Sequence, residues 1–452
     1  MQATPNNRRP VSRRLAAPLA LVLAVSLAGC GAFGGKEKPK TPTLGNRIPI
    51  LSRIDTGARV DPALANVSVI VPPAAANAEW PQAGGTASKS YGNLELAANP
   101  SRSWTAQVAG SDNKQRLAAA PVIGGGQLFV MDTTGTVHAY DAQTGAKRWS
   151  TAFSIKGDGQ NSVYGGGASY ADGRVYITTG LGEVAALDAT NGSIVWKVKP
   201  GGPLRGSPTI AFNSVFVMTM DNQVHSLNAA DGALLWNEAA SSGQTGVFGV
   251  AAPAAGQGTI VAGFSTGELV AYRYENGRQL WADALARTSL STTVGVLTDI
   301  DADPIIDRGR VFALGQGGRM AAYELVTGQR IWELNLAGIS TPAIAGDWIF
   351  TLTDDGKLLC IQRATGKVRW LTQLARFENE KKKKHPIFWT GPVLAGSRLW
   401  FANSAGQVYS AGVEDGEPVF YTDLKKPVTL APVVAGSTLY ILDDSGRISA
   451  FR

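Results

Sequence analysis

A fixed spacing recurs along most of this 452-residue chain and constrains its fold more than any other feature. Between Pro121 and Trp149, the proline, Gly135 and the tryptophan are separated by two equal steps of 14 positions. Such a period is typical of a repeat protein. Six further segments keep both steps, and they are marked by Ala168, Gly182 and Trp196; Pro208, Asn222 and Trp236; Pro253, Gly267 and Trp281; Pro304, Gly318 and Trp332; Pro342, Gly356 and Trp370; and Pro392, Gly406 and Phe420.

Each repeat has the sequence pattern of four short strands. Runs of β-branched and aromatic residues alternate with turn signals, of which Asp231-Gly232 and Asn276-Gly277 are strong because both dipeptides accept positive φ angles. A four-stranded antiparallel sheet of this kind has two apolar faces, so neighbouring sheets must stack and close into a ring. We therefore expect an all-β protein with almost no helix.

The last repeat predicts the number of blades. It begins at Pro432 and reaches Gly446 after 14 positions, but the sequence ends at Arg452 after only a third strand. We expect the missing fourth strand to come from residues 103–106, where Trp104 precedes the first repeat. Seven complete repeats and one shared repeat predict an eight-bladed β-propeller over residues 80–452, with its last blade closed by an N-terminal strand.

Residues 1–29 have the pattern of a secretory signal peptide. Four arginines precede an apolar run, residues 15–27, that is too short to cross a bilayer. Without these arginines the formal net charge of +7 falls to about +3. So small an excess gives little reason to expect nucleic-acid binding.

The signal ends in Leu27-Ala28-Gly29-Cys30, which resembles the lipobox of bacterial lipoproteins. We expect acyl chains on Cys30, and the glycine at position 31 resembles the pattern of lipoproteins sent to the outer membrane. Residues 30–79 are rich in Pro, Ala, Gly and Lys, which is typical of a flexible tether. Cys360 then has no disulfide partner, so we expect it to pack as a small apolar residue in a strand.

The motif that runs from Ala139 through Asp141, Thr144 and Gly145 to Trp149 resembles the docking motif of the quinoprotein (PQQ) propeller family. In that family the tryptophan packs between blades, while the aspartate and threonine fix the hairpin. Its dehydrogenases also need a calcium-bound quinone, a catalytic aspartate and often a pair of adjacent cysteines, and this chain lacks such a pair. The histidines are far apart in the sequence, at His138, His225 and His385. We therefore predict no catalytic residue, no metal site and no cofactor.

The lipobox, tether and propeller together resemble the BamB family of outer-membrane lipoproteins, and two loops make the resemblance more specific. The stretch from Pro203 to Pro208 resembles a Leu-Arg-Gly segment of the family, and Asp299-Ile300-Asp301 matches an Asp-Val-Asp segment. The family is a non-enzymatic scaffold at the periplasmic face of the outer membrane. These loops bind the POTRA domains of BamA there, and the family assists insertion of β-barrel proteins. The resemblance thus implies partner-binding roles for Leu204, Arg205, Asp299 and Asp301, with nascent barrel proteins as further partners.

One residue departs from the family pattern. Where the family has a second leucine two residues before Leu204, this chain has Gly202, so part of the apolar contact is expected to be missing or reorganised. Both loops connect a fourth strand to the next blade and lie two blades apart, so they emerge on one face where one partner can reach both. We expect Asp299 and Asp301 to be exposed there; the alternative is that Arg205 pairs with one of them.

Two charged loops allow further interpretations. The stretch "TDIDADP", residues 298–304, would need a glycine and a later glutamate to form a calcium loop of the EF-hand type, but Pro304 follows at once and begins a blade. The run Lys381 to Lys384 lies in another interblade loop, and it fits either a solvated surface or a site for an acidic partner or anionic lipid. Other periplasmic binding propellers and a PQQ-dependent dehydrogenase remain as alternative functions.

Overall fold

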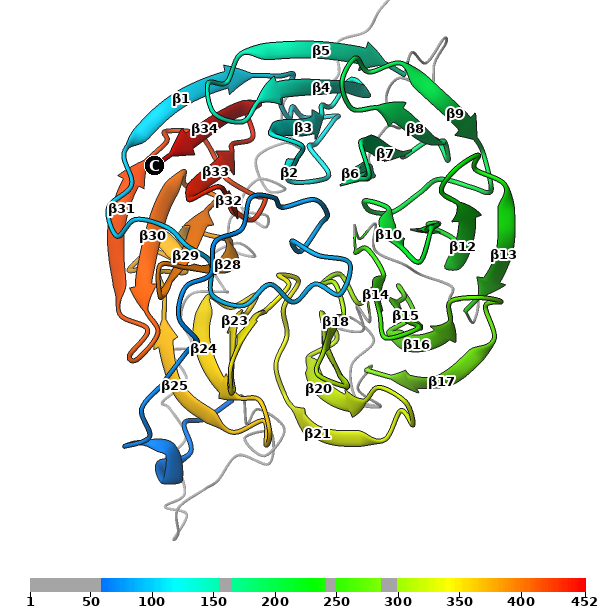
Figure 1. Cartoon of the computed structure of the whole chain (residues 1–452). Helices are drawn as coiled ribbons and strands as arrows, with labels where there is room; N and C mark the ends of the chain where they lie inside the picture. The colour runs from blue at the N-terminus through cyan, green and yellow to red at the C-terminus, as the bar shows by residue number, and fades with distance from the viewer. Residues whose placement is uncertain (1–57, 154–164, 241–248, 250, 286–298) are drawn as a thin grey trace, which may run out of the picture. The chain divides into compact units, whose positions relative to one another are not determined.

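The computed structural model describes residues 58–153, 165–240, 249, 251–285 and 299–452. These residues form eight four-stranded antiparallel sheets that are arranged as the blades of a ring, together with one separate two-stranded hairpin (Figure 1). The only helical segment among them is a 3-10 turn at Pro62–Leu64. The prediction of an all-β, eight-bladed propeller is confirmed.

In each blade the first strand lies nearest the ring axis and the last strand lies outermost (Figure 1). The strands of blades 1 to 4 are β2 (Val122–Gly124), β3 (Gln127–Met131), β4 (Thr136–Asp141) and β5 (Lys147–Ala152); β6 (Gly166–Ala171), β7 (Arg174–Thr179), β8 (Val184–Asp188) and β9 (Ile194–Val198); β10 (Thr209–Ala211), β11 (Ser214–Met218), β12 (Gln223–Asn228) and β13 (Leu234–Ala239); and β14 (Ala254–Gly256), β15 (Thr259–Gly263), β16 (Glu268–Arg273) and β17 (Gln279–Ala284).

Blades 5 to 7 follow the same order, and blade 8 joins the two ends of the ring. Their strands are β18 (Ile305–Asp307), β19 (Arg310–Gly315), β20 (Arg319–Glu324) and β21 (Arg330–Leu334); β22 (Ala343–Ala345), β23 (Trp348–Leu352), β24 (Lys357–Gln362) and β25 (Val368–Gln373); β28 (Trp389–Ala395), β29 (Arg398–Asn403), β30 (Gln407–Gly412) and β31 (Pro418–Asp423); and β32 (Val433–Ala435), β33 (Thr438–Leu442), β34 (Arg447–Phe451) and β1 (Arg102–Gln107). The closure predicted for the last blade is therefore confirmed, with Trp104 of β1 opposite Ala450 of β34.

Tryptophan packing between blades explains the spacing of the repeats. Trp281, at the end of blade 4, donates an Nε1 hydrogen bond to the Leu325 carbonyl of blade 5 at 2.8 Å. Its ring covers Gly328, where an added Cβ would lie 2.4 Å from a ring atom and where φ is +71°. Both the close approach and the positive φ therefore require glycine at this turn. Equivalent bonds to the next blade are made by Trp104, Trp149, Trp196, Trp236, Trp332 and Trp370.

Blade 7 keeps the spacing without this packing. Phe420 stands at the tryptophan position, but its side chain is 54% exposed. The neighbouring Tyr421 packs instead against Trp400 and Phe451, at ring-centroid distances of 5.1 and 5.6 Å. A different aromatic residue therefore joins blade 7 to blade 8.

Residues 77–94, named the strap below, run through the middle of the ring (blue in Figure 1). The strap hydrogen-bonds to the first strands of seven blades, whose inner edges would otherwise carry unpaired backbone groups. The strap therefore ties most of the ring together from inside. The bonded pairs are Asn77 with Val434 and Gly436, Trp80 with Ile123, Pro81 with Tyr170, Gln82 with Ile210, Ala87 with Ala255, Ser88 with Ile306, and Leu94 with Leu394 and Gly396.

Residues 58–79, which were predicted to belong to a flexible tether, lie against the propeller. Asp61 N donates to the Val368 carbonyl of β25 at 2.8 Å, and Lys367 Nζ lies 2.9 Å from Asp61 Oδ2. The buried Val69 donates its N–H to Glu414 at 2.7 Å. The predicted signal peptide, Cys30 and the remaining residues of the predicted tether lie outside the described residues. Among the described residues, no helix is long and apolar enough to cross a membrane.

Candidate partner-binding site at the interblade face

The segment 203–205 is held as a short additional strand beside β11. Arg205 N donates to the Met218 carbonyl at 2.9 Å, and Leu204 lies opposite Thr219 in an isolated bridge. The Leu204 side chain is fully buried in the apolar cluster between blades 2 and 3, where it packs with residues such as Tyr176. Leu204 was predicted to bind a partner, but its apolar side chain is buried within the propeller, where burial of apolar surface is favourable.

Arg205 joins three successive connections between blades. Its Nη2 donates to Asp299 Oδ1 at 2.8 Å and lies 3.4 Å from Asp301 Oδ1, while its Nε donates to the Gly249 carbonyl at 3.2 Å. These residues belong to the connections between blades 2 and 3, 3 and 4, and 4 and 5. The bonds thus bring together two segments that are 94 positions apart in the sequence. Leu204, Arg205, Gly249, Asp299 and Asp301 are called the Arg205 cluster below.

The sequence placed Asp299 and Asp301 correctly between blades 4 and 5, but the expected exposure is wrong. The side chain of Asp299 is fully buried and that of Asp301 is 14% exposed. The physical reason is the buried guanidinium, which attracts both carboxylates out of solvent. The alternative considered from the sequence, in which Arg205 pairs with these aspartates, is the arrangement in the structure.

The Arg205 cluster holds two carboxylates against one guanidinium. Burial raises the pKa of Asp299, and the positive charge of Arg205 opposes that rise. Burial and the negative charge of Asp299 raise the pKa of Asp301 to about 6, again with Arg205 opposing. Arg205 Nη1 and Asp299 Oδ2 are buried without a hydrogen-bond partner within the described part of the chain. Loss of the Arg205 charge should therefore disturb the cluster strongly, because it leaves the Asp299 carboxylate buried and unpaired.

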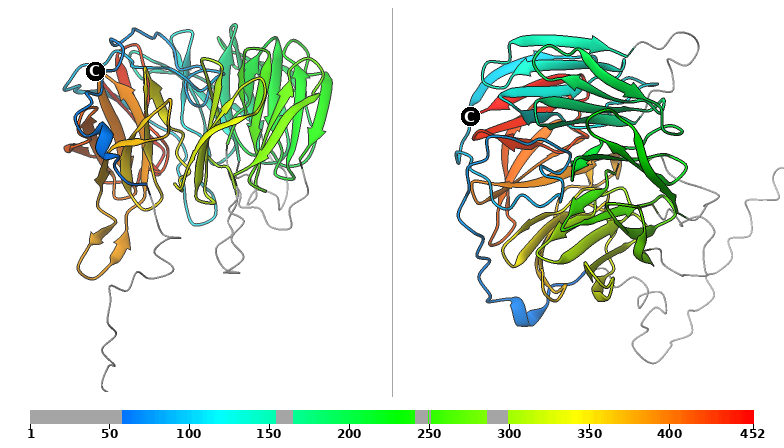
Figure 2. Two further views of the ribbon diagram at one scale, coloured as in Figure 1. Left: turned by 90° about the horizontal axis from the view of Figure 1, so that it is seen from below. Right: turned by 45° about the vertical axis from the view of Figure 1, so that its right-hand side comes forward.

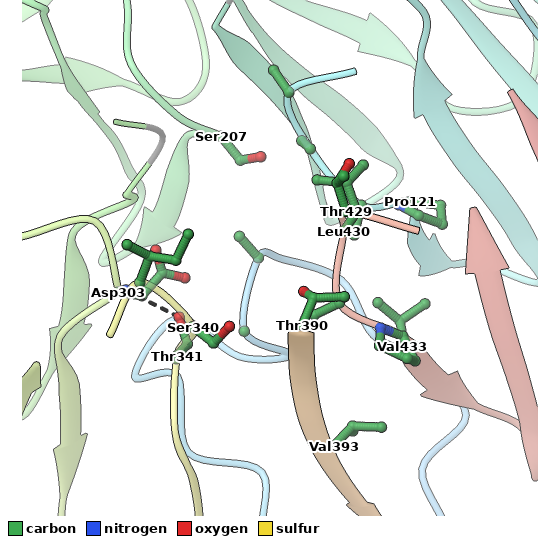
Figure 3. A pocket seen from close by; sticks show the side chains of 18 of the residues that line it. Pro121, Ser207, Asp303, Ser340, Thr341, Thr390, Val393, Thr429, Leu430 and Val433 are labelled. Atoms are coloured by element: carbon green, nitrogen blue, oxygen red, sulfur yellow. Dashed lines mark hydrogen bonds between the residues drawn. The ribbon is translucent and has the colours of Figure 1, made fainter. Parts of the chain in front are cut away.

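A second buried cation, Lys89 of the strap, was not identified from the sequence. Its Nζ donates to the Ala83 carbonyl at 2.9 Å and lies 3.3 Å from Thr209 Oγ1. Burial lowers the pKa of Lys89, and the negative charge of Asp303 opposes this. Asp303 N donates to Thr341 Oγ1 at 3.0 Å, as Figure 3 shows. Asp303 lies two residues before β18, at the entry to blade 5, whereas no spacing in the strap singles out Lys89.

A cavity of about 370 Å³ lies beside the strap, among the connections between blades (Figure 3). Asp301, Asp303 and Thr341 contribute polar atoms to its wall, while Trp80 and Tyr91 of the strap contribute apolar surface. Among the described residues, no group of three or more His, Cys, Asp or Glu side chains is arranged to hold a metal ion. The cavity is continuous with the Arg205 cluster through Asp301.

The remaining polar candidates have structural roles. His138 lies in β4, with Nε2 2.8 Å from Asp132 Oδ2, and His225 lies at the equivalent position in β12, where burial lowers its pKa. Both histidines therefore belong to blade strands. Cys360 is buried in β24, as predicted, and burial raises the pKa of its thiol.

Comparison with known proteins gives the family. The sequence profile described as "Outer membrane protein assembly factor BamB" matches residues 97–162 and 158–372, which is more than half of the chain. The chain belongs to the BamB family. Among BamB proteins, the outer membrane protein assembly factor of Escherichia coli strain K12 is 27% identical over 360 residues, which are 78% of this chain and 89% of that protein.

Solved structures show the same fold. The crystal structure of BamB from Moraxella catarrhalis matches with a TM-score of 0.66 and 19% identity, over 78% of this chain and 99% of that one. A quinohemoprotein alcohol dehydrogenase from Comamonas testosteroni has the same TM-score at 14% identity, over 87% and 82%. At such low sequence identities, the structural likeness shows only that the fold is shared. The predicted non-enzymatic role is supported by the BamB family assignment, since the family comprises assembly factors.

Proposed function

We propose that this chain is a non-enzymatic scaffold of the machinery that inserts β-barrel proteins into the outer membrane. Its interblade face, which carries the connections from each fourth strand to the next blade, binds the POTRA domains of BamA through the surface around Leu204, Arg205, Asp299 and Asp301. Acyl chains on Cys30 hold it at the periplasmic side of the outer membrane, and nascent barrel proteins are further ligands. The observation that carries this proposal is the Arg205 cluster, considered together with membership of the BamB family.

The buried members of the cluster contribute by holding the connections in place. An interface whose loops are ordered before binding loses less conformational entropy when the partner arrives. Arg205 and Asp299 fix the two predicted loops against each other at 2.8 Å. The atoms that reach a partner belong to the exposed Pro203 and to the partly exposed Asp301.

Gly202 leaves space at this surface. A Cβ atom added there would meet only Asp221 Oδ1, at 3.7 Å, which is an ordinary van der Waals distance. The backbone φ at Gly202 lies outside the left-handed region, so a Cβ atom can be added there without backbone strain. The apolar contact that the family makes with a second leucine is therefore sterically available but unfilled in this chain.

Affinity capture of BamA from detergent-solubilised membranes tests the proposal. Pro203→Glu adds a charge at the exposed residue next to the Arg205 cluster, and Ala233→Glu adds the same charge to the exposed turn at the opposite face of blade 3. We expect Pro203→Glu to reduce BamA capture at least tenfold, which corresponds to about 1.4 kcal/mol, and Ala233→Glu to leave it unchanged. Equal capture by both variants, with melting temperatures like that of the unmodified chain, would show that this surface is not the binding site.

A further inference from the structure

A basic hairpin projects from the interblade face between blades 6 and 7. It consists of β26 (Phe377–Asn379) and β27 (Lys384–Pro386), and it extends beyond the ring in the left view of Figure 2. Phe377 lies opposite Pro386 and Asn379 opposite Lys384. At its base, Ile387 N donates to the Arg376 carbonyl at 2.8 Å. The hairpin is therefore paired along its length and holds its tip away from the blades.

The charges at the tip of the hairpin are not neutralised by the protein. Residues 376–386 contain five Lys or Arg side chains and two carboxylates. Lys381 to Lys384 are exposed, and none of the ion pairs formed by the described residues includes them. One of the two carboxylates, Glu380, accepts a hydrogen bond from Arg376 N at 2.7 Å, so it is used to fix the turn. Asn379 Oδ1 accepts from Lys382 N at 3.0 Å, which also orders the backbone below the lysines.

We propose that the β26–β27 hairpin is a membrane contact, which places Lys381 to Lys384 on the headgroups of an anionic phospholipid bilayer. Protein interfaces are enriched in Arg and aromatic residues and depleted in Lys, whereas adjacent lysines are typical of segments that bind anionic lipid surfaces. The run of adjacent lysines therefore favours a bilayer over an acidic protein.

The course of the N-terminal segment is consistent with this contact. Val60 forms a parallel bridge with Val368 at the start of β25, and the hairpin follows the end of the same strand. Residues 30–57 can span at most about 3.3–3.6 Å each, so the proposed acyl anchor on Cys30 easily reaches the plane of the hairpin. One lipid anchor and one polybasic surface form the pair of signals that gives stable membrane attachment. The anchor is part of the proposed function, but lipid binding by the hairpin does not depend on BamA.

Vesicle sedimentation without acyl chains tests the hairpin directly. The chain from residue 30 onward with Cys30→Ser contains every residue that the structure describes. It is mixed with vesicles of phosphatidylcholine alone or with about 30% phosphatidylglycerol, a content chosen to give a clearly negative surface. The test variant replaces all four hairpin lysines with glutamine. The matched control removes four exposed charges elsewhere, at Lys114, Lys147, Lys199 and Arg278, also by glutamine.

We expect the chain to bind only the vesicles that contain phosphatidylglycerol. Each lysine near an anionic surface contributes about fivefold in affinity, so removal of four should reduce binding at least tenfold, and high salt should reduce it similarly. The scattered control should keep most of its binding. Equal binding to both vesicle types, or equal loss in the hairpin variant and the control, would overturn the proposal. If the unmodified chain does not bind vesicles and the hairpin variant no longer captures BamA, the membrane proposal is overturned in favour of an acidic protein partner.

Discussion

Replacing Arg205 with alanine tests whether the buried cluster stabilises the propeller. The fully buried carboxylate of Asp299 loses its ion-pair partner, and breaking a buried pair from one side costs about 3–5 kcal/mol of unfolding free energy. The cost cannot exceed that of protonating Asp299, because a neutral carboxyl group no longer needs an ion-pair partner. From an ordinary pKa near 4, neutralising the carboxylate costs about 5 kcal/mol at pH 7.5 and about 2 kcal/mol at pH 5.5.

The direction of the pH effect follows from proton binding. In the variant, the pKa of Asp299 in the folded state lies above its value in the unfolded state. The folded state therefore binds more protons, and stability falls as the pH rises between the two values. We expect Arg205→Ala to lower the free energy of unfolding by about 3–5 kcal/mol at pH 7.5 and by roughly 2 kcal/mol at pH 5.5.

Urea unfolding followed by tryptophan fluorescence at both pH values measures this difference. The double variant Arg205→Ala with Asp299→Asn removes the stranded carboxylate, so it should recover much of the stability lost at pH 7.5. It should also lose the additional pH dependence. A penalty below about 1 kcal/mol, which is typical of exposed ion pairs, would refute the reasoning. So would a penalty of the same size at pH 5.5 and pH 7.5.

Three further perturbations test other parts of the structure. Burial raises the pKa of Asp301 to about 6, so the ionised carboxylate destabilises the fold at neutral pH. Asp301→Asn should therefore raise the free energy of unfolding at pH 7.5 by up to about 3 kcal/mol but leave it unchanged at pH 4, as measured by urea unfolding. Trp281→Ala removes the ring that joins blades 4 and 5 and should cost about 3–5 kcal/mol in the same assay. A chain that begins at residue 58 should have the same melting temperature as the longer protein. A chain that begins at residue 95 loses the hydrogen bonds of the strap, each worth about 0.5–1.5 kcal/mol, and its melting temperature, measured by calorimetry, should be much lower.

The repeats were predictable because each blade repeats the same local physics. In most blades a glycine turn with positive φ is covered by a tryptophan from the neighbouring blade. This requirement fixes the sequence spacing of the glycine and the tryptophan, so the repeat can be recognised without knowing any three-dimensional contact. The closing strand was predictable for the same reason, since Trp104 stands where a blade needs its last tryptophan. Phe420 shows the limit of the pattern, because it keeps the spacing while its side chain is exposed.

The strap and the buried charges were not predictable from the sequence. Lys89 and Gln82 have no periodic spacing, and their contacts lie on inner strands more than 100 positions away. Exposure of the predicted site was misjudged because the loop containing Asp299 looks like surface until Arg205 is found beside it. Pairing of charges across 94 positions is a property of the closed ring rather than of either loop.

Site-specific photocrosslinking tests most directly whether the interblade face binds BamA. A photoreactive amino acid replaces Pro203 in one variant and Ala233, at the opposite face of blade 3, in another, and both are expressed with BamA in membranes. We expect a crosslink to the POTRA domains from position 203 and none from position 233. A crosslink from position 233 alone, or no crosslink from position 203 in a complex that still co-purifies, would contradict the proposed binding.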